Sequence, residues 1–279
     1  MEPLGQAIVG FLAGLLGGLL GIGGSIIIIP ALVVYLSHTA EGYGGDTQHL
    51  IQAAAMICNV FVAAPAVLAH YRAKALIKPV VVLLIPFGIV GIVLGVATSN
   101  SSAFARDNGV YLAMIYAGFL LYVAVYNTWR LLSKVDFSQG FDPDRRIPWP
   151  KTASVGLTMG FLGGMLGIGG GVVAVPMQQI LLRMPLRRAV ANSAATIMVV
   201  STLGAVYKNA TLPTHGIAVW ASVQLALALI PTAVLGSYLG GRMTHALPRT
   251  ALRVIFLMFM ILMAYLTFIE AWAAWQGRA

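Results

Sequence analysis

Residues 14–30 read GLLGGLLGIGGSIIIIP, and residues 160–176 read GFLGGMLGIGGGVVAVP. The two stretches lie 146 positions apart and are identical at ten positions. A second pair, PFGIVGIVLG at 86–95 and PTAVLGSYLG at 231–240, follows at a spacing of 145. Two matches in the same order and at nearly the same spacing indicate that the chain contains two copies of one structural unit.

The composition is typical of a protein that lies in a lipid bilayer. The chain is 59% hydrophobic and only 9% charged, whereas a soluble domain carries roughly 25% charged residues. Apolar stretches such as 80–97 contain no charged residue, and a helix needs about 20 apolar residues to cross a bilayer. Continuous apolar stretches, as opposed to alternating ones, favour helices over a barrel. We therefore predict an all-α polytopic membrane protein.

The apolar segments divide the chain into two repeats of four segments each. We expect the first repeat at 1–132, a polar linker at 133–151 and the second repeat at 152–279. The expected segments are 4–36, 48–71, 77–98 and 109–132 in the first repeat, and 152–182, 186–207, 216–241 and 249–273 in the second.

The first segment of each repeat is too long for one simple span. A helix over all of 4–36 would be about 50 Å long, whereas the hydrocarbon core is about 30 Å thick. Each of these segments also contains Gly-Ile-Gly-Gly near its middle, and glycine disfavours helix. Two arrangements fit: a re-entrant hairpin, or a single span with a central break.

The positions of the basic residues favour the hairpin. With two hairpins, 14 of the 17 Lys and Arg lie on one side, and only Arg106, Lys208 and Arg278 lie on the other. With two single spans the division is ten to seven. Basic residues concentrate on the cytoplasmic side of membrane proteins. Hairpins leave three spans in each repeat, so the two repeats have opposite orientations, a common arrangement in secondary transporters.

The glycine-rich breaks form a candidate anion site. A helix begins after each break, and its first N–H groups have no partner within the helix and attract negative charge. Packing between helices is the alternative role, and it is the expected one for the outer glycines, such as Gly14 and Gly91. The substrate-binding candidates at the breaks are Gly23, Gly24, Ser25, Gly169, Gly170 and Gly171.

Polar side chains in the apolar segments complete the candidate site. Asn192, Ser193 and Thr196 share one helical face by their spacing, and Asn59 is a candidate counterpart in the first repeat. For other polar residues we expect contacts between helices, namely Gln52, Gln178, Gln179, Ser201, Thr202 and Gln224. Arg72 and Lys208 end corresponding segments, where we expect them to anchor the helices at the membrane surface.

The residue types exclude several other classes of function. The single cysteine, Cys58, rules out a disulfide within the chain and a metal site built from cysteines. There is no His-Glu zinc motif, and Asp and Glu are missing from the spans except for Glu270. The net charge of +9 comes from residues in short loops, where membrane topology explains them better than binding of nucleic acid. We expect no enzyme, no metal and no cofactor; the partners are a small anion and the bilayer.

The doubled glycine motif resembles the signature of the sulfite exporter TauE/SafE family. The resemblance covers nearly the whole chain and is clearest from GGGVVAVPMQQILLRMPLRRAVANSAA to VLGSYLGGRMTHALPRTALRVIF. The first repeat differs, with the loop SHTAEGYGGDTQHL and with Ala53, Ala54 and Ala55 where the second repeat has Asn192 and Ser193. The resemblance implies an inner-membrane carrier that exports small sulfur-containing anions such as sulfite or organosulfonates. An anion channel, a carrier of another small anion and a membrane scaffold are the alternatives.

Overall fold

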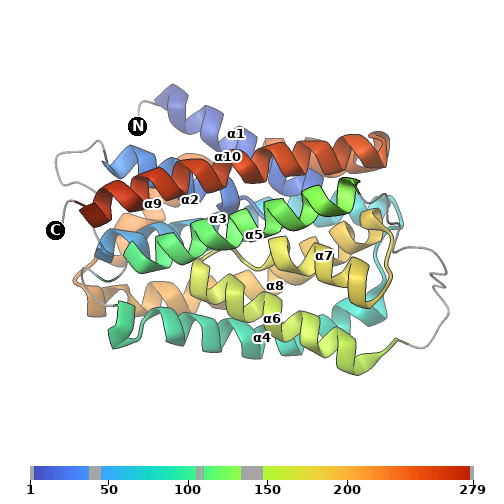
Figure 1. Cartoon of the computed structure of the whole chain (residues 1–279), viewed down its shortest axis with the longest axis horizontal. Helices are drawn as coiled ribbons and strands as arrows, with labels where there is room; N and C mark the ends of the chain where they lie inside the picture. Colours follow the sequence, from blue (N-terminus) through green and yellow to red (C-terminus); the bar gives the residue numbers. More distant parts are fainter. Residues whose placement is uncertain (1–2, 38–44, 105–107, 109, 133–146, 277–279) are drawn as a thin grey trace.

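The computed structural model describes residues 3–37, 45–104, 108, 110–132 and 147–276. Every regular element in these ranges is a helix, as predicted (Figure 1). Residues 133–146 lie outside the described ranges, so the division into two repeats and a linker stays a prediction. The α-helices are α1 (Pro3–Leu20), α2 (Ser25–Ser37), α3 (Gly45–Arg72), α4 (Lys78–Ser99), α5 (Val110–Leu132), α6 (Trp149–Leu166), α7 (Gly171–Leu181), α8 (Leu186–Thr211), α9 (Val219–Ala246) and α10 (Arg249–Gln276).

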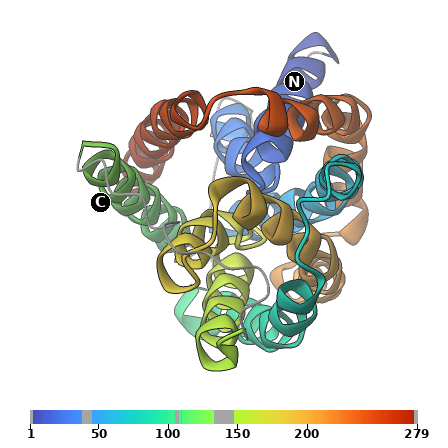
Figure 2. The same ribbon diagram turned by 90° about the vertical axis from the view of Figure 1, so that its right-hand side faces the viewer.

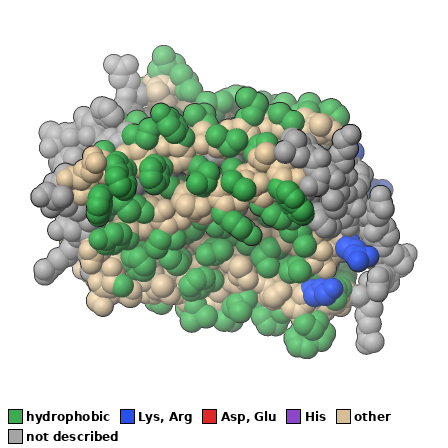
Figure 3. Space-filling view, viewed as in Figure 1, with side chains coloured by type: hydrophobic (Ala, Val, Ile, Leu, Met, Phe, Trp, Pro, Cys, Tyr) green, Lys and Arg blue, Asp and Glu red, His purple; other side chains and the backbone are tan. Residues whose placement is uncertain are grey.

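Five helical stretches among the described residues are long and apolar enough to cross a membrane. They are Pro3–Leu20, Asp46–Arg72, Lys78–Ser99, Leu186–His215 and Val219–Ala246. Hydrophobic side chains cover most of the face shown in Figure 3, and the basic side chains visible there lie at its right-hand end. The prediction of a polytopic helical membrane protein is confirmed.

Both long segments are interrupted at their glycines. The first tip, residues 21–24, separates α1 from α2, and the second tip, residues 167–170, separates α6 from α7. Gly23 has a φ of 81° and Gly169 a φ of 67°, which lie in the left-handed region that side chains other than glycine's rarely adopt. In Figure 1, α1 and α2 enter from the left and α6 and α7 from the right.

The outer glycines bring α1 against α9 and α4 against α6, which lie side by side in both views (Figures 1 and 2). A β-carbon added to Gly91 of α4 would meet the carbonyl oxygen of Leu157 in α6. One added to Gly236 of α9 would meet the carbonyl oxygen of Phe11 in α1. Gly236 follows Gly91 by 145 positions and Leu157 follows Phe11 by 146. The two contacts are therefore equivalent and reciprocal, and the predicted packing role of the outer glycines is confirmed.

Hydrogen bonds between distant segments define two ends of the helix bundle. At the His49 end, Asn100 Nδ2 donates to Thr211 Oγ1 over 2.8 Å. At the Arg72 end, the backbone N–H of Ile77 donates to Asn192 Oδ1, also over 2.8 Å. The His49 end comprises residues 46–49, 99–104 and 208–215, and the Arg72 end comprises residues 69–78, 183–192 and 238–249. In Figure 1 the His49 end is on the left, where the chain termini also lie, and the Arg72 end is on the right.

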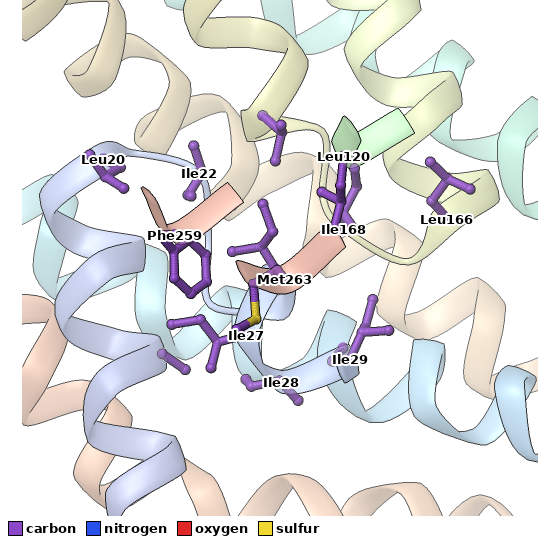
Figure 4. Close-up of a cluster of buried hydrophobic side chains, with 14 of the residues drawn as sticks. Leu20, Ile22, Ile27, Ile28, Ile29, Leu120, Leu166, Ile168, Phe259 and Met263 are labelled. Carbon is purple, nitrogen blue, oxygen red and sulfur yellow. The ribbon is translucent and has the colours of Figure 1, made fainter. Parts of the chain in front are cut away.

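Apolar side chains enclose the two tips. Ile22 of the first tip and Ile168 of the second are fully buried, and they occupy equivalent positions in the two repeats. Phe259 and Met263 of α10 and Leu120 of α5 lie in the same buried cluster (Figure 4). The tips are thus held in an apolar surrounding, in which unpaired polar groups are costly.

Candidate functional site

The two tips meet inside the bundle with Asn59 between them. A β-carbon on Gly171 would meet Cα of Ile22, so the two tips are in backbone contact. A β-carbon on Gly23 would lie 2.6 Å from Asn59 Oδ1, and one on Gly169 would lie 2.8 Å from Asn59 Nδ2. Asn59 is fully buried and lies near the middle of α3. The structure therefore brings together predicted site residues from both repeats.

Asn59 caps the first of the two helices that begin at the tips. Its Oδ1 accepts a hydrogen bond of 2.9 Å from the backbone N–H of Ser25, and its Nδ2 donates to Ser25 Oγ over 3.0 Å. Ser25 is the first residue of α2, so its N–H has no partner within the helix. From the sequence we expected this N–H to face the ligand, whereas in the structure it donates its hydrogen bond to Asn59.

The second of these helices has no such cap. The N-cap of α7 is Gly170, with a φ of 82° and no hydrogen bond from a side chain to the start of the helix. The carbonyl oxygen of Gly170 accepts from the N–H groups of Val173 and Ala174. The positive end of the α7 dipole at Gly171 is therefore the helix start at which a negative charge would be stabilised.

One face of α8 carries two buried hydroxyl groups, and the hydroxyl of Ser201 lies at the second tip. Ser201 Oγ would lie 2.6 Å from a β-carbon on Gly169, and side-chain atoms of Ile197 approach both Gly169 and Gly171. Ser193 and Ser201 are each four residues from Ile197, so the three share a face. Both serines are fully buried, and neither hydroxyl has a hydrogen-bond partner among the described residues. An unpaired buried hydroxyl costs about 1–3 kcal/mol, and a bound anion would accept its hydrogen bond.

Two predicted residues of α8 have partners elsewhere. Asn192 Oδ1 accepts from Ile77, and its Nδ2 contacts Gln178 Oε1 at 3.4 Å and Met184 Sδ at 3.1 Å. Thr196 Oγ1 donates to the carbonyl oxygen of Asn192 over 2.8 Å. Asn192 thus joins α8 to the α3–α4 connection at the Arg72 end.

Two of the predicted glycines face packing neighbours. A β-carbon on Gly24 would lie 3.0 Å from Val62 Cγ2, and one on Gly170 would meet the carbonyl oxygen of Met159. Both positions are closed by apolar or backbone atoms. The glycines that face the shared polar site are instead Gly23 and Gly169.

Gln52 and Ser201, for which we predicted contacts between helices, both lie at the second tip in the structure. Gln52 lies beside Gly167, where its Nε2 donates to the carbonyl oxygen of Met165 over 3.1 Å. Its Oε1 is buried without a partner. The spacing along each helix could have indicated these positions. Gln52 precedes Asn59 by two helical turns on α3, and Ser201 follows Ser193 by just over two turns on α8.

A second polar cluster lies at the His49 end. Lys208 is fully buried, which corrects the expected role as a surface anchor. Its Nζ lies 2.8 Å from His49 Nδ1, 2.8 Å from Ser99 Oγ and 2.7 Å from Asn100 Oδ1. His49 Nε2 faces the carbonyl oxygen of Phe104 at 3.1 Å, which can only accept, so His49 Nδ1 is the acceptor for Lys208. The cluster joins α8 to α3 and to the end of α4.

This architecture defines a polytopic helical membrane protein in which two glycine-rich tips meet beside buried polar side chains. The chain belongs to the sulfite exporter TauE/SafE family, whose profile matches residues 6–267. The family resemblance seen in the sequence is thereby confirmed.

Relatives of this chain carry names of membrane transporters. "Probable membrane transporter protein MamO" of Magnetospirillum gryphiswaldense is 30% identical over 91% of this chain and 43% of its own length. "Probable membrane transporter protein YunE" of Bacillus subtilis is 29% identical over 87% of each chain. A Methanocaldococcus jannaschii protein named "Probable membrane transporter protein MJ0441" is 26% identical over 88% of each chain. The chain thus spans less than half the length of MamO. The family and these names bear out the prediction that the chain is not an enzyme.

No solved structure matches this chain.

Proposed function

We propose that the protein is a secondary transporter that exports small sulfur-containing anions, such as sulfite or organosulfonates, across the cell inner membrane. The substrate binds where the two tips meet, between Asn59, the start of α7 and the hydroxyl of Ser201. The family name and the names of the relatives support transport of such an anion. The site residues are proposed from geometry.

The observation that carries the proposal is the uncapped start of α7 beside an unpartnered buried hydroxyl. Helix N-termini bind anions through free N–H groups and the helix dipole. The hydroxyl of Ser201 adds a neutral donor, and Asn59 Nδ2 also faces the β-carbon position of Gly169. These donors suit an oxyanion.

The proposed topology has two re-entrant hairpins in opposite orientations. Two single spans would place the α4–α5 connection and the α8–α9 connection on opposite sides of the membrane. The hydrogen bond from Asn100 to Thr211 joins these two regions directly, which supports the hairpins. With hairpins, 14 of the 17 Lys and Arg lie on the same side of the membrane as the Arg72 end, so the Arg72 end faces the cytoplasm.

The test uses Ser201→Ala in detergent-purified protein. A hydrogen bond to a charged group contributes roughly 1.5–3 kcal/mol, so we expect sulfite affinity to fall roughly ten- to a hundred-fold. Thermal stability should be kept, because the hydroxyl has no partner in the part of the chain that the structure describes. Thr202→Ala is the matched control: Thr202 is exposed and its hydroxyl donates to the carbonyl oxygen of Met198. Equal sulfite affinity in Ser201→Ala and wild-type protein, measured by calorimetry, would place the site elsewhere.

Reconstituted vesicles separate a carrier from an anion channel. A carrier shows saturable sulfite flux that is accelerated by sulfite on the opposite side. A channel conducts without this acceleration. Flux that stays proportional to sulfite concentration and ignores the opposite side would contradict transport by a carrier.

A further inference from the structure

A cavity of about 420 Å³ lies between α3 and α9 at the Arg72 end, away from the tips. The helices are close here because Gly241 packs against Ala66 and Ala69. The cavity is lined by Ala69, Arg72, Ala73, Tyr238, Arg242 and His245. We call it the arginine pocket.

The arginine pocket has the side chains of an anion site and no acid. Arg72 Nη1 donates to Tyr238 Oη over 3.1 Å, and Arg242 Cζ lies 5.9 Å from the centre of the Tyr238 ring. Tyr238 thus positions both guanidinium groups at the pocket. His245 Nε2 lies 3.0 Å from His70 Nδ1 on the α3 side. None of the six lining residues is Asp or Glu, so the guanidinium groups remain available for an anion with several oxygens.

Apolar side chains continue from the pocket toward the middle of the helices. Leu68 precedes Arg72 by four residues on α3, and Leu235 precedes Arg242 by seven on α9, so each shares a face with its arginine. Leu68 is 44% exposed and Leu235 is 65% exposed. A free inorganic anion would use only the basic groups. A phospholipid would use the basic groups for its phosphate and the exposed leucines for its acyl chains.

We propose that the arginine pocket binds the phosphate headgroup of an anionic phospholipid. The site resembles the basic pockets between membrane helices that bind lipid headgroups. It has positive charge at the membrane surface and apolar side chains below it. The three segments of the Arg72 end carry eight Lys and Arg and no Asp or Glu, and this positive charge raises the local concentration of anionic lipid. A lipid in this position would brace α3, which carries Asn59, against α9. Lipid binding is independent of which anion the protein transports.

The experiment compares lipids on delipidated, detergent-purified protein. We expect phosphatidylglycerol to raise the thermal unfolding temperature, and to stay bound in native mass spectrometry, where phosphatidylcholine does neither. Glycerol 3-phosphate and inorganic phosphate at the same concentration should have no effect. Arg72→Gln with Arg242→Gln should weaken binding of phosphatidylglycerol at least tenfold, as expected when charge-assisted hydrogen bonds are lost.

Two further variants make the result independent of folding defects. Lys151→Gln removes one exposed positive charge from the start of α6, outside the pocket, and should bind phosphatidylglycerol as wild type does. Ala73→Asp places a carboxylate at an exposed lining position and should repel the phosphate without disturbing the core.

Three results would overturn the proposal. Equal stabilisation by phosphatidylcholine would mean that the lipid is not selected by charge. Equal stabilisation by glycerol 3-phosphate or inorganic phosphate would make the pocket a site for soluble anions. Unchanged binding of phosphatidylglycerol in folded Ala73→Asp and in the double arginine variant would show that the lipid binds elsewhere.

Discussion

At the scale of single residues, the site depends on two glycines that cannot carry a side chain. Gly23 and Gly169 both have a left-handed φ. At each of them, a polar side chain of another residue lies where a β-carbon would be. Gly23 faces Asn59, and Gly169 faces both Asn59 and Ser201. A methyl group at either position would strain the backbone and displace the donors that we assign to the substrate.

We expect Gly169→Ala to weaken sulfite binding more than tenfold. The left-handed conformation costs alanine about 1–2 kcal/mol, and the added methyl would lie 2.6 Å from Ser201 Oγ. Gly118→Ala is the matched control, since Gly118 is exposed on α5 and an added methyl meets nothing within 4 Å. Calorimetry on folded, monodisperse protein measures the affinity. Wild-type affinity in Gly169→Ala would mean that the second tip does not approach the substrate.

The glycine tips could be located from the sequence, but the side chains that face them could not. A repeated helix-breaking string in an apolar segment identifies a tip without any structure. Which residues of α3 and α8 face a tip depends on the rotation of those helices about their own axes, and their weak amphipathicity leaves it undetermined. Asn59 was therefore predictable as a buried polar residue, whereas the approach of Ser201 to Gly169 required the structure.

At the scale of helices, the His49 end is held together by the buried amino group of Lys208. Hydropathy places Lys208 near the end of an apolar segment, where lysines usually reach water. In the structure its three neighbours come from segments more than 100 positions away in the chain. Such partners leave no local pattern in the sequence, which explains why the predicted anchoring role was wrong.

We expect Lys208→Met to destabilise the protein although methionine is apolar and similar in length. The change would leave His49 Nδ1 and Asn100 Oδ1 without their donor, and each unsatisfied buried group costs about 1–3 kcal/mol. Lys151→Met removes the same charge at an exposed position and should change stability by less than about 0.5 kcal/mol. Thermal unfolding in one detergent compares the two, and equal unfolding temperatures would show that the cluster does not stabilise the fold.

The reciprocal helix contacts give a second prediction at this scale. Gly160→Val and Gly14→Val should destabilise the protein to a similar degree, because the added β-carbons meet the carbonyl oxygens of Gly88 and Ala233, which are equivalent positions. Gly5→Val, at a position with nothing within 4 Å, should have little effect on packing. The yield of monodisperse protein and its unfolding temperature measure the result. A large effect of only one of the first two variants would contradict equivalent packing in the two repeats.

At the scale of the whole molecule, the contacts between distant segments decide how the chain crosses the membrane. The lengths of the segments could be predicted from the sequence, but length alone fits both a hairpin and a broken span. The distribution of basic residues favoured the hairpin over the broken span, because basic residues concentrate on the cytoplasmic side. The hydrogen bonds of Asn100 with Thr211 and of Ile77 with Asn192 support the proposed hairpins, because each bond joins segments from the two halves of the chain at one end of the bundle.

The opposite orientation of the repeats can be measured by labelling single cysteines in intact cells. The background is Cys58→Ala, which removes a buried thiol. We expect Thr214→Cys, exposed at the His49 end, to react with an impermeant maleimide from outside. Thr250→Cys, exposed at the start of α10, should react only after the membrane is opened, because it lies at the Arg72 end with most of the basic residues. Ser102→Cys is the control, since it faces outside with hairpins and with single spans alike. Single spans would reverse the other two sites, because each broken segment would then carry the chain across the membrane once more. Labelling of Thr250→Cys in intact cells, together with protection of Thr214→Cys, would therefore establish the spanning arrangement and exclude inverted repeats.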